Sequence, residues 1–150
     1  ANRTAFDENI DYEISYALRY NAPVSMILLD IDHFKQVNDR HGHLKVDEIL
    51  HQLAVLISGN VRDVDTVHRW GGEEFMVLLP NTKLEPAAIC AEHLRGIVAN
   101  HLFDLAEPIT ISLGVTQMKN GEGRDGWIRR VDQALYLAKS SGRNQVRQLT

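Results

Sequence analysis

Residues 24–32 read Val-Ser-Met-Ile-Leu-Leu-Asp-Ile-Asp, an apolar run that ends in two acids separated by one residue. The run lacks the polar spacing of an amphipathic helix, which favours a central strand buried on both faces. Alternate residues of a strand face the same side. We therefore expect the carboxylates of Asp30 and Asp32 to point the same way at the end of this strand.

Helical and strand patterns alternate along the rest of the chain. Helical spacing of apolar residues covers 4–20, 33–40, 44–58, 85–100 and 127–140. Strand patterns cover 66–70, 75–79, 108–118 and 145–149, and a polar glycine-rich loop covers 119–126. This order predicts one α/β (α+β) domain over residues 1–150, with helices flanking a mixed central sheet.

A hairpin is expected where Gly71-Gly72 separates two of these strands. Paired glycines are typical of a tight turn with positive φ. Glu73 and Glu74 follow, and successive strand residues face opposite sides, so one acid is expected to face a site and the other the opposite surface. A solvated hairpin that merely carries two acids is the alternative.

The composition limits the classes of partner. Hydrophobic residues make up 44% of the 150 residues, enough for one core, and the net charge of -4 argues against a nucleic-acid polymer. The lone Cys90 excludes an internal disulfide, favours a reducing, cytoplasmic setting and is expected to be a buried core thiol. No apolar run is long enough to cross a membrane, so this segment is expected to make no membrane contact.

Acids at the end of an apolar strand need compensation, and a hard cation such as Mg2+ would supply it. A solvated strand end is the alternative for Asp30 and Asp32. Lys35 follows closely and could meet a phosphate, as could Lys139 and Arg143 near the end of the last helix. Cations at a helix C-terminus are also favoured by the dipole alone, so this feature stays open.

Taken together, several strings resemble the GGDEF family of diguanylate cyclases, in the family's order and spacing. These strings are Asp30-Ile31-Asp32-His33-Phe34-Lys35, Asn38-Asp39, Gly42-His43, Asp47, Arg69-Trp70-Gly71-Gly72-Glu73-Glu74-Phe75, Ser112-Leu113-Gly114-Val115, Asp132-Gln133-Ala134-Leu135-Tyr136-Leu137-Ala138-Lys139 and Gly142-Arg143-Asn144. The resemblance spans nearly the whole chain. It implies a fold similar to the palm of nucleotidyl cyclases and polymerases, in a domain excised from a longer sensor protein that could itself be membrane-anchored.

The resemblance also implies a metal site and a catalytic acid. Asp30 would bind Mg2+, with Mn2+ as an alternative, through its carboxylate, and Ile31 through its backbone carbonyl. Glu73 would be a metal ligand and the proton acceptor. Glu74 is a second candidate for the acid-base or second-metal role, and Asp32 would support the site.

The implied substrate is GTP, and the residues that would contact it are Phe34, Lys35, Asn38, His43, Asp47, Lys139 and Arg143. Asn38 and Asp47 would read guanine, and Lys35 would contact phosphates and stabilise the transition state. Lys139 and Arg143 would grip the β- and γ-phosphates. Two GTP molecules would condense to cyclic di-GMP and two pyrophosphates across a two-fold homodimer.

Product control is implied by Arg62-Asp63-Val64-Asp65, which fits the family's Arg-x-x-Asp inhibitory site for cyclic di-GMP. Arg62 would contact guanine edges and phosphates, and Asp65 would accept from guanine N–H groups. A plain surface ion pair is the alternative reading.

The sequence departs from the family at Val46, where a glycine is usual. This valine is expected to narrow the base pocket or shift Asp47, so that Val46→Gly would tighten GTP binding or raise activity. The third letter of the signature is Glu73 in place of aspartate, and the family's Asp-x-Leu-Thr-Gly-Leu stretch does not precede Asn2 in this sequence. The alternatives are a degenerate domain that binds GTP or cyclic di-GMP without catalysis, a structural dimerisation module, and a cyclase for another purine nucleotide.

Overall fold

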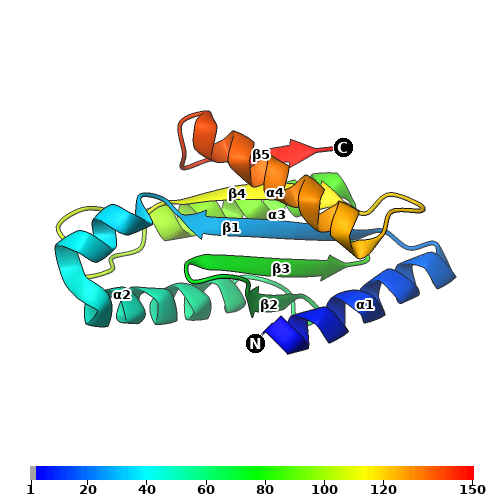
Figure 1. The fold of residues 1–150 in the computed structure, drawn as a ribbon, viewed down its shortest axis with the longest axis horizontal. Coiled ribbons are helices and arrows are strands. Elements are labelled where there is room, and N and C mark those ends of the chain that lie inside the picture. The colour runs from blue at the N-terminus through cyan, green and yellow to red at the C-terminus, as the bar shows by residue number, and fades with distance from the viewer. Residues whose placement is uncertain (1–2) are drawn as a thin grey trace.

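The computed structural model describes residues 3–150 and contains a five-stranded sheet covered by helices on both faces (Figure 1). Its elements in chain order are α1 (Arg3–Tyr20), β1 (Val24–Ile31), α2 (Phe34–Ser58), β2 (Thr66–Arg69), β3 (Glu74–Pro80), α3 (Leu84–Ala99), β4 (Ile111–Gln117), α4 (Arg124–Ser140) and β5 (Val146–Leu149). The predicted α/β class with a mixed sheet is confirmed.

The sheet is mixed because only its last pair of strands is parallel. The strand order is β2-β3-β1-β4-β5. The central strand β1 is antiparallel to both β3 and β4, while β4 and β5 are parallel. The register places Asp30 beside Glu74 of β3 on one side and Ser112 of β4 on the other.

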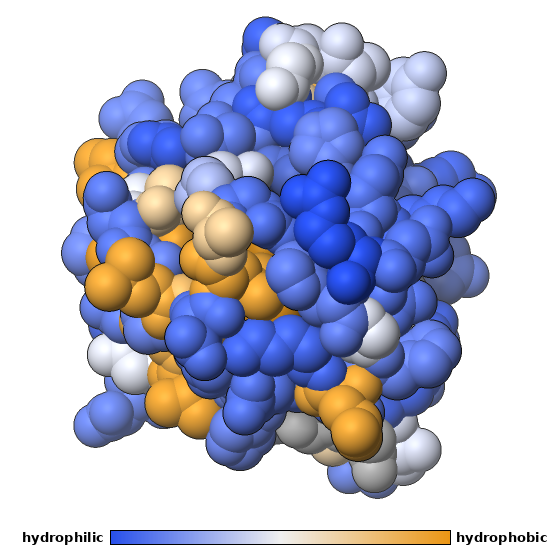
Figure 2. Space-filling model, turned by 90° about the vertical axis from the view of Figure 1, so that its left-hand side faces the viewer, coloured by the Kyte–Doolittle hydropathy of each residue, from blue (hydrophilic) through white to orange (hydrophobic). Residues whose placement is uncertain are grey.

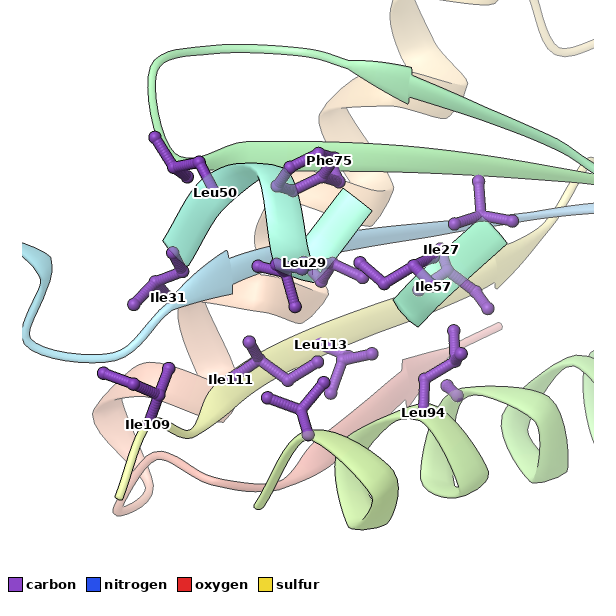
Figure 3. Close-up of a cluster of buried hydrophobic side chains, with 14 of the residues drawn as sticks. Ile27, Leu29, Ile31, Leu50, Ile57, Phe75, Leu94, Ile109, Ile111 and Leu113 are labelled. Carbon is purple, nitrogen blue, oxygen red and sulfur yellow. The ribbon is translucent and has the colours of Figure 1, made fainter. Parts of the chain in front are cut away.

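Two hydrophobic cores cover the two faces of the sheet, and the alternation of β1 divides its residues between them. Ile27, Leu29 and Ile31 belong to the core under α2 and α3 (Figure 3). Met26 and Leu28 belong to the core under α1 and α4. Asp30 continues the alternation of Met26 and Leu28, so its carboxylate points to the α4 side of the sheet.

The helix boundaries differ from the prediction at two places. The helices expected at 33–40 and 44–58 form one element, α2, with a kink at Gly42, whose φ of 80° and ψ of 169° are not helical. α4 begins at Arg124, three residues before the predicted start, because the glycine-rich loop contributes the first helical turn.

The hairpin between β2 and β3 is confirmed, but the reason for its glycines is different. Neither Gly71 nor Gly72 has a positive φ. A Cβ atom at Gly71 would lie 2.9 Å from the Glu74 side-chain oxygen Oε1, so a larger residue there would make the end of the Glu74 side chain shift. The backbone N–H of Trp70 donates to the carbonyl of Glu74 and closes the turn.

Cys90 lies on α3 and is only partly buried, packed against the edge of the α2–α3 core. Burial raises the pKa of its thiol, which keeps it protonated at neutral pH. Cys90 is therefore a protonated thiol that contacts the core, as expected, but it is less deeply buried than expected. Within residues 3–150, no helix is both long and apolar enough to span a membrane.

Candidate active site

A cleft of about 260 Å3 opens where β1 ends and α2 begins. Its walls come from the β1–α2 turn, the β2–β3 hairpin, the end of α4 and the loop after it. The lining residues are Asp30, Ile31, Asp32, His33, Phe34, Lys35, Gln36, Glu73, Lys139 and Arg143. The surface at this end of the molecule is largely hydrophilic, with some apolar patches (Figure 2). The structure thus brings both predicted acids and all three predicted cations to one place.

Asp30 is the most deeply buried acid of the predicted metal site, with 4% of its surface exposed. Its Oδ2 accepts a charge-assisted hydrogen bond from Lys139, which reaches it from α4. Burial raises the pKa of Asp30, while Lys139 opposes that rise and the nearby carboxylates of Glu73 and Asp32 add to it. A site that gathers acids in this way favours an additional cation.

The second oxygen of Asp30 suits a metal ion. Oδ1 is buried and has no hydrogen-bond partner among the described residues. Within residues 3–150, no three side chains of His, Cys, Asp or Glu form a cluster that could hold a metal by themselves. A Mg2+ ion commonly takes one or two carboxylates and completes its shell with water and substrate phosphate oxygens. Asp30, Glu73 and the Ile31 carbonyl fit that kind of incomplete protein site.

Glu73 and Glu74 do not divide between opposite surfaces as expected. Glu73 lies in the hairpin turn and lines the cleft. Glu74 is the first residue of β3 and pairs with Asp30 in the ladder. Burial raises the pKa of Glu74, and the negative charge of Asp30 adds to the rise. Both carboxylates therefore interact electrostatically with Asp30. Glu74 lies beside Asp30 on the neighbouring strand and does not line the cleft.

Asp32 supports the cleft through three hydrogen bonds. Its carboxylate accepts from the hydroxyls of Thr110 at 2.7 Å and Ser112 at 2.6 Å, and from the backbone N–H of Asn144 at 2.9 Å. The loop that it holds has positive φ at Gly142, Arg143 and Asn144. Such a backbone persists only where the surroundings determine it. Asp32 thereby fixes the loop that presents Arg143 to the cleft.

We expect Asp32→Asn to weaken substrate binding more than it slows turnover. An asparagine retains one acceptor oxygen but puts an N–H2 group among three donors, which should free the loop and move Arg143. We expect KM for GTP, the substrate that the resemblance implies, to rise about tenfold and the free energy of unfolding to fall by about 1–3 kcal/mol. Steady-state kinetics with thermal unfolding checks this. An unchanged KM would show that the loop keeps its position without Asp32.

The predicted guanine-reading residues lie outside the cleft, farther along α2. Asn38 is half-buried, and its Oδ1 has no hydrogen-bond partner among the described residues. His43 and Asp47 are exposed on the other side of the Gly42 kink. Phe34 and Lys35, in contrast, line the cleft itself. The kink of α2 therefore separates the residues expected at the phosphates from those expected at the base.

The expectation that Val46 narrows the base pocket is wrong. Its side chain is 4% exposed and packs in the core between α2, α3 and the sheet, whereas Asp47 is exposed. Successive helical residues point about 100° apart, so the two side chains need not share surroundings. Val46 thus extends the hydrophobic core, and removing it would open a cavity instead of a binding site.

Val46→Ala is expected to lower the free energy of unfolding by about 2 kcal/mol, because it removes buried methyl groups and leaves a cavity. We expect the affinity for GTP to stay within about twofold of the parent. Chemical denaturation and nucleotide titration of both proteins measure the two effects. Tighter nucleotide binding in the variant would restore the steric explanation.

Arg62 and Asp65 form a tight pair, with the Asp65 side chain 1% exposed and that of Arg62 53% exposed. Asp65 accepts from the backbone N–H of Arg62 and from its Nε and Nη2. Nη2 also donates to the carbonyl of Pro80 and to Thr82. In this arrangement Asp65 holds the Arg62 guanidinium at the surface. Its expected role as an acceptor for a guanine base stays a prediction.

Sequence reasoning missed two kinds of residue at the cleft. His33 and Gln36 line it, and His33 has the uncommon φ of 56° that turns the chain from β1 into α2. Thr110 and Ser112 supply the donors to Asp32 from β4. Only the strand alternation around Ser112 could have indicated which side of the sheet this side chain faces, because its partner Asp32 lies 80 positions away in the chain.

Known proteins are similar to this chain in sequence and in fold. The profile of the family described as "Diguanylate cyclase, GGDEF domain" matches residues 1–145. The chain is 40% identical over 148 residues to the diguanylate cyclase DgcP of Pseudomonas aeruginosa, covering 97% of this chain and 22% of DgcP. It therefore spans about a fifth of that relative's length.

Two solved structures show the same architecture. The GGDEF domain of DgcB from Caulobacter crescentus, in complex with c-di-GMP, superposes with a TM-score of 0.94 at 32% identity, covering 99% of this chain and 90% of that one. The active GGEEF domain of a diguanylate cyclase from Vibrio cholerae gives a TM-score of 0.86 at 40% identity, covering 93% and 90%. The fold is that of GGDEF domains. This chain belongs to the GGDEF-domain family of diguanylate cyclases.

Proposed function

We propose that this domain condenses two GTP molecules into cyclic di-GMP and two pyrophosphates. The observation that carries the proposal is the cleft, where a buried carboxylate with one unpartnered oxygen faces Glu73 and the cations Lys35, Lys139 and Arg143. Cations of this kind suit a triphosphate, and the acids suit the metal that accompanies it. A purely structural module would have no use for this combination.

The side chains of the cleft would act mainly by positioning GTP and by neutralising the charge of its phosphates. Lys139 and Arg143 would bind the β- and γ-phosphates, and Lys35 would contact a phosphate and stabilise charge in the transition state. Glu73 would accept the proton of the attacking ribose 3′-hydroxyl as that oxygen bonds to the α-phosphorus and pyrophosphate leaves. Glu74, whose pKa is raised by burial, is the second candidate for proton transfer.

Asp30, Glu73 and the carbonyl of Ile31 would hold Mg2+, or Mn2+ in its place. The ion supplies Lewis-acid polarisation of a phosphoryl oxygen and neutralises negative charge. Asn38 and Asp47 would read the guanine base and His43 would contact the nucleotide, which requires GTP to extend from the cleft along α2. A polar pocket of this kind rejects a base that leaves its groups unpaired.

Two copies of the domain would face each other, because each copy would bind one GTP and the product joins two. Each 3′-hydroxyl would then meet the α-phosphate held by the other copy, which gives a two-fold homodimer. The second candidate function is a degenerate domain that binds nucleotide without turnover. The active GGEEF domain of a diguanylate cyclase from Vibrio cholerae is named for the same string as residues 71–75 here, which favours catalysis.

The deciding experiment incubates the chain with GTP and Mg2+ and separates the products by chromatography. We expect cyclic di-GMP and pyrophosphate in a ratio of one to two, and no cyclic product with ATP. Omitting the metal should stop the reaction, and Mn2+ should restore it. Nucleotide binding without product over the whole range of metal and protein concentration would establish the degenerate alternative.

Control by product is the remaining part of the proposal. Arg62 is held by Asp65 with its guanidinium half-exposed, as a binding site for guanine edges or phosphates requires. We expect an Arg62→Ala, Asp65→Ala double variant to lose product inhibition while its initial rate stays within about twofold, because the pair is not part of the cleft. Initial rates at rising cyclic di-GMP test this, and equal inhibition of both proteins would place the inhibitory site elsewhere.

A further inference from the structure

The loop between α3 and β4, residues 101–110, runs alongside α2 in the opposite direction. Four side-chain contacts join this loop to α2 and to the turn before it, and their partners follow in reverse order of sequence: His101 with Gln52, Asp104 with Lys45, Glu107 with His41, and Thr110 with Asp32. Phe103 and Ile109 are buried in the core and anchor the loop. A loop that is anchored in this way can hold a helix in position.

The kink of α2 at Gly42 is the part of the helix that needs such support. It separates Asn38 from Asp47, the two residues expected to read the base. Gly42 has a φ of 80°, and among residues 3–150 nothing outside its own turn of helix lies within 4 Å of the position that a Cβ atom would take. Packing at Gly42 therefore does not fix the angle between the two halves of α2, and contacts on either side of the kink must do so.

Glu107 makes the contact on the half before the kink. Its Oε1 lies 2.5 Å from Nε2 of His41, the residue that directly precedes Gly42, and its Oε2 lies 3.6 Å from Arg40. The hydrogen bond with His41 lowers the pKa of Glu107, so Glu107 is ionised at neutral pH. A carboxylate only accepts hydrogen bonds, and His41 must therefore carry a proton on Nε2 and donate it.

The His41 contact is better protected from water than the other charged contacts of this loop. The side chains of His41 and Glu107 are 21% and 29% exposed, whereas Arg40 is 66% exposed. On the far side of the kink, Asp104 is 95% exposed and lies 3.4 Å from Lys45. Exposed ion pairs contribute little. The hydrogen bond between His41 and Glu107 is therefore the main polar link that holds the loop to the kink.

We propose that Glu107 is a positioning residue for guanine recognition, because its hydrogen bond with His41 fixes the angle of α2 at Gly42 and thereby the spacing of Asn38 and Asp47. This inference rests on the proposed function, in which those two residues read the base. Glu107 does not line the cleft. Its loss should therefore weaken the recognition of guanine and leave the chemistry at the α-phosphate nearly unchanged.

Calorimetry with the α,β-methylene analogues of GTP and of inosine triphosphate tests the proposal. Their carbon bridge prevents turnover, and inosine lacks the 2-amino group of guanine. We expect the parent chain to bind the guanine analogue about tenfold more tightly than the inosine analogue. Glu107→Ala should weaken the guanine analogue about fivefold and reduce the preference to about twofold, while kcat with GTP stays within about twofold of the parent.

A conservative variant and a control show whether the hydrogen bond itself is responsible. Glu107→Gln keeps an amide oxygen that can accept from His41, so it should bind the guanine analogue within about twofold of the parent. Glu8→Ala removes the same charge from an exposed position on α1 and should change neither affinity. Thermal unfolding of each variant shows that it remains folded.

A double variant tests whether Glu107 acts through His41. His41→Ala should weaken the guanine analogue about fivefold, as Glu107→Ala does. The double variant should be no weaker than either single variant, because both changes remove the same contact. Losses that multiply to about twenty-five-fold would show that the two residues act independently and would overturn the proposed link.

The remaining outcomes separate this inference from the proposed function. If the parent prefers the guanine analogue and Glu107→Ala keeps both its affinity and its preference, the inference is overturned alone. The same holds if Glu107→Ala weakens both analogues equally, because base recognition is then unaffected. A parent chain that binds the analogues with the expected preference but forms no cyclic di-GMP from GTP would overturn the proposed catalysis and leave the inference standing. If the parent shows no preference, base reading fails and the inference fails with it.

Discussion

Asp30→Asn is expected to lower kcat/KM for cyclic di-GMP synthesis on the order of a thousandfold, and Glu73→Ala to do the same. Asp30 is 4% exposed, and its free Oδ1 is the oxygen offered to the metal, while Lys139 holds Oδ2. Asparagine keeps the shape of the side chain, but it removes the negative charge and replaces one acceptor oxygen with an N–H2 group. Metal binding and transition-state stabilisation should therefore be lost together. Product formation at saturating Mg2+ and GTP is the measurement.

A matched variant separates loss of chemistry from loss of charge or fold. Asp125→Asn removes the same charge from α4, at a side chain that is 88% exposed and outside the cleft, and should keep full activity. Asp30→Asn should remain folded because Lys139 is 35% exposed and can turn to solvent. Thermal unfolding checks this. Turnover above a tenth of the parent rate in folded Asp30→Asn would remove Asp30 from the catalytic group.

Gly114→Ala is expected to lower the free energy of unfolding by about 3 kcal/mol, which is at the upper end of what overpacking costs. Gly114 lies at the middle of β4, directly beneath α4. A Cβ atom there would come within 2.4 Å of the backbone nitrogen of Leu135 and 2.7 Å of the carbonyl oxygen of Val131. Both are backbone atoms of one helix, so a side-chain rotation cannot relieve the clash and α4 must move.

The displacement of α4 should also reach the cleft, because this helix carries Lys139 and leads to Arg143. We expect KM for GTP to rise in the fraction that stays folded. Gly96→Ala is the control, since Gly96 lies inside α3 with open space around its Cβ position and alanine should stabilise that helix by roughly 0.5–1 kcal/mol. Chemical denaturation of both variants measures the difference. A stable Gly114→Ala protein would mean that α4 packs more loosely than the structure shows.

The cleft shows which features of a site can be predicted from a sequence pattern and which cannot. The two-residue alternation of β1 predicted that Asp30 and Asp32 share a side, and both line the cleft. The alternation follows from local backbone geometry, so it can be read without knowing the neighbours. The different tasks of the two acids could not be read in this way. Asp32 is saturated by donors from β4 and from the loop before β5, whereas Asp30 keeps one oxygen free.

Where a prediction went wrong, a residue was judged by its neighbours in the chain. Val46 was placed at the base pocket because Asp47 adjoins it, but helical rotation turns its side chain into the core. Gly71 and Gly72 were expected to have a positive φ, but neither has one.

The sequence by itself determined the elements of this protein, the hairpin, the position of the acids at a strand end and the family to which the chain belongs. These features depend on short-range periodicity, turn chemistry and strings of adjacent residues. Only the tertiary structure decided that Lys139 binds one oxygen of Asp30 across 109 positions, and that Asp32 fixes the loop that carries Arg143. Each of these contacts joins elements distant in the chain, so strand order and helix packing create it, and no local pattern records it.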